Sequence, residues 1–151
     1  MNIFKLFKKK ELKEFHREFP VVGTMTCKAE DESRCKDWSR SVDFLWLRDA
    51  VLSFGDPVDS DGDIAVMTRQ YQLALDNAQA IRQSIESSFR FVTLRSQGID
   101  PDRYVGIPGI VMRTHDDEGN VHPHLAVAYE TADDGAVWFS IEDGEMTSYD
   151  A

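Results

Sequence analysis

The chain has 151 residues, with 27 acidic and 17 basic side chains, and its formal net charge is -10. A chain of this length can bury a core without disulfides or metals, and 42% hydrophobic and 11% aromatic residues argue against a disordered protein. The negative charge disfavours nucleic acid as a partner, because such binding depends on basic side chains that displace counterions from phosphates. The composition therefore predicts one acidic globular domain without a nucleic-acid partner.

The charge is distributed unevenly along the chain. Residues 1–20 carry six basic and three acidic side chains, a net charge of +3, so the other 131 residues carry -13. At helical spacing the apolar side chains of this leader fall on one face and the lysines on the other, up to Pro20. We therefore expect a basic amphipathic leader helix over residues 1–20 and a single acidic α+β domain over residues 21–151.

Three roles fit such a leader helix: docking on its own domain, lying on a membrane surface through residues 1–19, or packing against a partner protein. The side chains that would contact a membrane or a partner are Phe4, Lys5, Phe7 and Lys9.

Apolar periodicity predicts the remaining elements in chain order. β-Branched residues indicate a strand over residues 21–28, and the apolar run over residues 42–54 indicates another. From Met67 the apolar residues recur every three or four positions, which predicts one long helix ending before Gly98. Four short apolar runs separated by turn sequences then predict an antiparallel β-meander over residues 109–114, 121–129, 137–141 and 146–149. The expected fold class is α+β: the N-terminal helix, N-terminal strands, and one long central helix packed on the C-terminal antiparallel meander.

Two cysteines, Cys27 and Cys35, have a spacing that matches neither a redox pair nor a zinc site. The N-terminal segment lacks the uninterrupted apolar core of a signal peptide. We therefore expect reduced thiols in a cytoplasmic protein, which the leader helix could hold at the inner face of the membrane. The sequence does not show whether the two thiols approach each other, and it carries no signal for a cofactor or an oligomeric state.

The histidines around the first turn of the meander are the weak candidates for metal-dependent chemistry. His122 and His124 share one strand face, because side chains alternate along a strand. A four-residue turn would place His115 on that face, whereas a three-residue turn would send it to the other. No catalytic motif is present, so no catalytic residue is predicted and a metal-dependent enzyme is an alternative hypothesis.

One face of the meander favours a binding role. Trp138 would lie there with His122 and His124, beside the small residues Ala126 and Ala128. Tryptophan is enriched at binding surfaces, and small neighbours allow a partner to approach. The alternative is that the N-terminal strands or the leader helix cover Trp138.

Most of the acidic residues lie in predicted turns and would form a rim that attracts a basic partner. The candidate rim residues nearest the meander are Asp116, Asp117, Glu118, Asp133 and Asp134. In general character only, without a shared motif, a small acidic α+β protein of this kind resembles the immunity proteins that neutralise bacterial toxins. The leading hypothesis is therefore a non-enzymatic inhibitor of a basic protein such as a toxin. The alternatives are the metal-dependent enzyme and a peripheral membrane or scaffold protein.

Overall fold

Eight strands form one sheet in the computed structural model, which describes residues 10–58, 60–133 and 135–147. Strand accounts for 45% of the described residues and helix for 26%, the latter in three short α-helices and one 3-10 helix over Glu32–Arg34. The predicted fold class, with an N-terminal helix and one long helix on a meander, is therefore wrong. The strands are β1 (Lys13–Phe19), β2 (Gly23–Ala29), β3 (Ser39–Phe44), β4 (Leu47–Phe54), β5 (Tyr104–His115), β6 (Val121–Thr131), β7 (Ala136–Glu142) and β8 (Glu145–Thr147). The helices are α1 (Asp61–Asp76), α2 (Ala78–Glu86) and α3 (Phe89–Ser96).

Strand β1 occupies the second half of the segment predicted as a leader helix. It pairs antiparallel with β2 along its whole length. Phe15 and Phe19 are four residues apart, a spacing that places them on one face of a helix and also on one face of a strand. The strand buries Phe19 against Trp38 and Phe54, whereas a short isolated helix has little stability of its own. The predicted contact residues Phe4, Lys5, Phe7 and Lys9 lie outside the described residues.

The strands follow chain order across the sheet, and all neighbours are antiparallel except β4 and β5. The parallel pair is short, with Val51–Phe54 beside Gly109–Met112. The helices form the long crossover that a parallel pair requires. The single strand predicted over residues 42–54 is instead a hairpin of β3 and β4. Its turn contains Leu45 and Trp46, so the usual glycine or asparagine signal is missing.

The predicted long helix is divided into α1, α2 and α3. Helix α1 starts earlier than predicted because Ser60 caps it: the Ser60 hydroxyl accepts the Asp63 N–H at 3.1 Å and donates to the Asp63 carboxylate at 2.8 Å. The chain leaves the helical path at Asn77 and again at Ser88, whose backbone is extended and whose side chain caps α3. Each helix therefore directs its own apolar side chains into the core.

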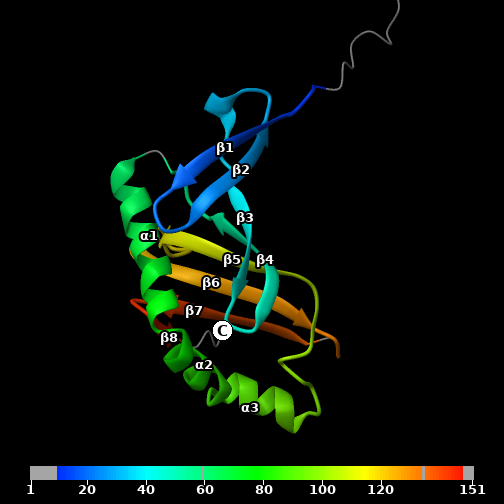
Figure 1. Cartoon of the computed structure of the whole chain (residues 1–151). Helices are drawn as coiled ribbons and strands as arrows, with labels where there is room; N and C mark the ends of the chain where they lie inside the picture. Colours follow the sequence, from blue (N-terminus) through cyan, green and yellow to red (C-terminus); the bar gives the residue numbers. More distant parts are fainter. Residues whose placement is uncertain (1–9, 59, 134, 148–151) are drawn as a thin grey trace, which may run out of the picture.

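The core lies between the helices and one side of the sheet (Figure 1). The β3–β4 hairpin crosses the same side. There the centroid of the Trp46 ring lies 5.9 Å from the centroid of the Phe91 ring and 6.2 Å from that of the Phe139 ring. The Arg82 guanidinium lies 4.2 Å from the centre of the Trp46 ring. On the other side of the sheet Ala128 and Trp138 remain exposed. None of the described helices is long and apolar enough to cross a membrane.

Candidate functional site

The candidate site is the side of β5, β6 and β7 that faces away from the helices, which we call the open sheet face. The strand register places Gly109, Ala128 and Trp138 next to one another on these three strands. Trp138 is 44% exposed, and its neighbours are too small to cover an indole ring. The adjacent row of the open sheet face contains Val111, Ala126 and Ser140.

The exposure of Trp138 bears on the two alternatives that the sequence left open. A solvated strand face usually carries polar side chains, so a large exposed indole among alanines departs from that pattern. Within the described ranges, the N-terminal strands do not cover Trp138. The open sheet face therefore combines an exposed aromatic ring with room for a partner to approach it.

At one end of the open sheet face, His122 and His124 line a hollow of about 320 Å³ with Arg113 and Glu142. His122 Nε2 lies 3.2 Å from a Glu142 carboxylate oxygen. His124 is buried, and its Nδ1 lies 2.5 Å from the His122 carbonyl oxygen. Because a carbonyl oxygen only accepts hydrogen bonds, His124 Nδ1 carries the proton. The charges of the hollow are largely paired with one another, since Arg113 also binds Asp117 at 2.7 Å.

His115 does not join the other two histidines. The register pairs His115 with Val121 and Arg113 with His124, and a bulge lies between these pairs. This differs from both registers considered from the sequence. His115 Nδ1 instead lies 2.8 Å from the Thr114 hydroxyl. In the described part of the chain, no group of three or more histidine, cysteine or carboxylate side chains could hold a metal ion.

Asp116 explains the register, because its carboxylate organises the turn from β5 to β6. It accepts the Asn120 N–H at 2.8 Å and the Glu118 N–H at 3.0 Å. The hydrogen bonds from Asn120 are the main cause that lowers the pKa of Asp116 below its usual value. Asp116 therefore has a structural role in the turn, whereas the side chain of Asp117 is 73% exposed despite its contact with Arg113.

The acidic residues predicted to form a rim lie at both ends of β6. Asp116, Asp117 and Glu118 belong to the turn before β6, and Asp133 is exposed in the turn after it. Asp134 lies outside the described residues. Because β6 spans Val121–Thr131, the two acidic turns are separated by the length of the open sheet face. Acidic charge therefore flanks Trp138 along the strand direction.

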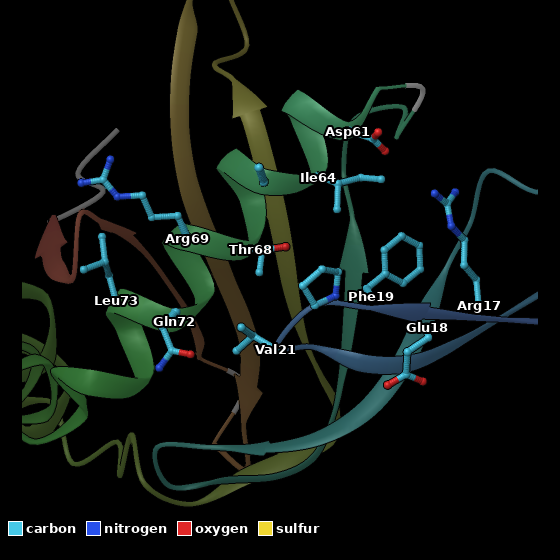
Figure 2. A pocket seen from close by; sticks show the side chains of 12 residues that line it. Arg17, Glu18, Phe19, Val21, Asp61, Ile64, Thr68, Arg69, Gln72 and Leu73 are labelled. Atoms are coloured by element: carbon cyan, nitrogen blue, oxygen red, sulfur yellow. The ribbon is translucent and has the colours of Figure 1, made fainter.

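A second concave surface, which the sequence did not indicate, lies between the end of β1 and α1 (Figure 2). This groove has a volume of about 660 Å³. Phe19 and Val21 line it from the β1–β2 hairpin, opposite Ile64 and Thr68 of α1. The prediction of a helix over residues 1–20 concealed the groove, because the groove exists only when β1 is a strand.

The two cysteines are free thiols that contact each other. Cys27 is buried, and Cys35 is partly buried. Burial, followed by a hydrogen bond with Cys27, raises the pKa of the Cys35 thiol to about 11. Cys35 is therefore protonated near neutral pH and is not an activated nucleophile.

No protein family, no curated protein and no solved structure matches this chain. The chemistry of the open sheet face and of the groove is thus the basis for assigning a function.

Proposed function

We propose that this protein is a non-enzymatic binding protein of the inhibitor or immunity type, which neutralises a basic protein partner through its open sheet face. The observation that carries the proposal is the 44% exposure of Trp138 among small side chains. Tryptophan frequently forms the centre of an interface, where its truncation weakens binding strongly. Gly109 and Ala128 beside it would let the partner reach the ring and the sheet together.

The charge distribution supports a basic partner. The chain carries a formal net charge of -10, and Asp117, Glu130 and Asp133 are exposed around the open sheet face. Acidic groups around an aromatic centre accelerate encounter with a basic protein and disfavour acidic competitors. The proposal places this encounter in the cytoplasm, where the free thiols of Cys27 and Cys35 would stay reduced.

Site-specific photocrosslinking tests the proposal. A photoreactive phenylalanine analogue in place of Ala136, which is exposed two positions from Trp138 on the same face of β7, would capture the partner in the cells that produce the protein, and the captured protein would then be purified for kinetic measurements. We expect a basic protein whose association rate with the wild-type chain falls about tenfold or more between low salt and 0.5 M salt. Trp138→Ala should weaken the affinity by about tenfold or more.

Two further variants make this test specific. Leu75→Ala is the control, because Leu75 is 41% exposed on α1, outside the open sheet face, and its removal should leave the affinity unchanged. Glu130→Lys should slow association, because Glu130 is exposed on β6 two positions from Ala128. Association that is insensitive to salt, or equal affinities for the wild-type and Trp138→Ala chains, would contradict the proposal.

A further inference from the structure

We propose that the groove between β1 and α1 binds an extended peptide segment of a partner protein. The segment would add to the free edge of β1 as a further strand and would place apolar side chains and one carboxylate between β1 and α1. The groove shares no lining residue with the open sheet face, so this inference goes beyond the proposed function and does not rest on it.

The first argument is the free edge of β1. In the described part of the chain β1 pairs only with β2, so its outer backbone groups form an unpaired edge seven residues long. The other edge strand, β8, has three residues and contacts α2. An uncovered edge of this length is a template onto which an extended peptide can add by main-chain hydrogen bonds.

The second argument is that the groove opens along this edge. The consecutive residues Arg17, Glu18 and Phe19 all line it, although alternate side chains of a strand point to opposite faces. No residue of β2 lines the groove, and α1 forms its other wall. A cavity with such a lining borders the outer edge of β1. A peptide strand in it would pair with β1 and pack its side chains on α1.

The third argument is the size and character of the groove. Its volume of about 660 Å³ lies within the range of roughly 300–1,000 Å³ that is usual for ligand sites. Phe19 and Val21 on one side and Ile64 and Leu73 on the other provide apolar walls. Val21 is 54% exposed, so an apolar residue now in contact with water would be covered by the peptide.

The fourth argument is charge. Arg17 and Arg69 line opposite ends of the groove, and neither guanidinium has a carboxylate partner among the described residues. Neither of the two acidic residues that line the groove, Glu18 and Asp61, pairs with Arg69. Glu18 accepts the Thr24 hydroxyl at 2.5 Å and points away from α1, and Asp61 lies two helical turns from Arg69. In a protein of net charge -10, an unpaired arginine at the rim of an apolar groove favours a peptide carboxylate at the Arg69 end, where the side chain extends from α1 away from Val21.

The fifth argument is the hydroxyl of Thr68. This residue is 7% exposed, and in the described part of the chain its hydroxyl has no hydrogen-bond partner. Figure 2 shows the hydroxyl directed from α1 into the groove. A buried polar group without a partner is destabilising. A peptide carbonyl in the groove is an acceptor that would satisfy it.

Peptide selection on the full chain tests this inference. A phage-displayed library of random dodecapeptides would be selected on the wild-type protein, and the consensus would be synthesised with a fluorescent label for anisotropy measurements. We expect alternating apolar residues with an aspartate or glutamate next to them. Two N-methylated versions then test strand pairing, one methylated on the odd and one on the even backbone amides. Only one set faces β1, so one version should bind at least about tenfold more weakly than the other.

Protein variants locate the peptide. Arg69→Glu should weaken binding about tenfold, whereas Arg103→Glu, the same charge change at an exposed loop position, should not. Thr68→Val keeps the side-chain shape but removes the hydroxyl. It should weaken peptide binding several-fold while the free protein unfolds at the same or a higher temperature, because an unsatisfied buried group is removed. Weaker binding together with an unchanged or higher unfolding temperature would show that the Thr68 hydroxyl contacts the peptide, because a variant that had lost its fold would unfold at a lower temperature.

Several results would overturn the inference. They are equal loss of affinity for the two N-methylated peptides, equal effects of Arg69→Glu and Arg103→Glu, or binding that Trp138→Ala abolishes. Dodecanoate serves as the small-molecule comparison, because it combines a carboxylate with an apolar chain. If dodecanoate binds in an Arg69-dependent manner and no peptide is enriched, the groove is a site for an amphipathic acid and the peptide assignment is wrong.

Discussion

Asp56 shows how a single carboxylate connects two distant parts of the chain. One of its oxygens accepts the Thr114 N–H at 2.6 Å, the Thr114 hydroxyl at 3.1 Å and the His115 N–H at 3.4 Å. Burial by itself raises the pKa of Asp56, but these hydrogen bonds and the charge of Arg113 outweigh it and hold the pKa below its usual value. Asp56 thus attaches the loop after β4 to the end of β5.

We expect Asp56→Asn to lower the free energy of unfolding at pH 7 by about 1–2 kcal/mol, because the amide accepts weaker hydrogen bonds than the carboxylate. A depressed pKa in the folded state stabilises the protein above the unfolded pKa of about 3.9, and this stabilisation is lost as the pH falls through the folded pKa. The difference between the two proteins should therefore be constant near neutral pH and should shrink below about pH 4.

Urea unfolding at several pH values measures this difference. Glu145→Gln is the control, because Glu145 is exposed on β8 and its side chain has no hydrogen-bond or ion-pair partner within the described ranges. A difference between the wild-type and Asp56→Asn proteins that persists unchanged at pH 3 would show that the charge of Asp56 is not the stabilising feature.

At the scale of elements, the turn between β1 and β2 combines strain with a position beside the groove. The Val22 N–H donates to the Pro20 carbonyl at 2.7 Å, and Val21 between them has a φ of 64°. This is the rare, strained form of the γ-turn, and a β-branched residue with positive φ is a genuine outlier. Gly23 follows with a φ of 88°, and any side chain there would meet the Arg40 guanidinium. The hairpin therefore contains an unfavourable backbone conformation at Val21.

We expect Val21→Gly to stabilise the protein. Backbone strain of this kind costs about 1–3 kcal/mol, and the added chain entropy of glycine offsets roughly 1 kcal/mol of the relief. A net gain of about 1 kcal/mol would raise Tm by about 3 °C in a chain of this size. Thermal unfolding followed by circular dichroism measures the change. Val121→Gly is the matched control, because Val121 is 79% exposed and has no positive φ, so this substitution should lower Tm.

At the scale of the whole molecule, one core joins both halves of the sheet. Phe19 of β1 and Trp38, just before β3, belong to the same cluster of buried residues as Phe91 of the crossover and as Val127 and Phe139 beyond it. Since the β4–β5 pair is the main-chain connection between the two halves of the sheet, packing on the helices must carry much of the coupling. We therefore expect the described residues to unfold as one cooperative unit.

Tryptophan fluorescence can test this cooperativity from two positions. Variants that retain only Trp38 or only Trp46, with the other tryptophans replaced by phenylalanine, report on different parts of the core, because Trp38 packs on Phe19 of β1 whereas Trp46 packs on Phe139 of β7. We expect both variants to show a urea midpoint by fluorescence that coincides with their own midpoint by far-UV circular dichroism. Separate midpoints for the two signals in either variant would show that the halves unfold independently.

Local signals in the sequence located the last four strands and the small residues around Trp138. Turn-forming residues separate these strands, and side chains alternate strictly along β6 and β7, so the composition of each face follows from local pattern alone. Each of these features depends on residues close together in the chain. The structure contains these four strands and these small residues around Trp138, although the predicted fold class is wrong.

Tertiary structure alone decided the nature of β1, the parallel pairing of β4 with β5 and the existence of the groove. Phe15 and Phe19 fit a helix and a strand equally well, and only the neighbouring β2 and the core select the strand. The break at Asn77 and the turn at Leu45 carry no strong local signal either. Pairing between distant segments depends on the free energy of the packed core, which no local pattern of residues contains. A binding site bounded by β1 and α1 therefore becomes visible only in the folded chain.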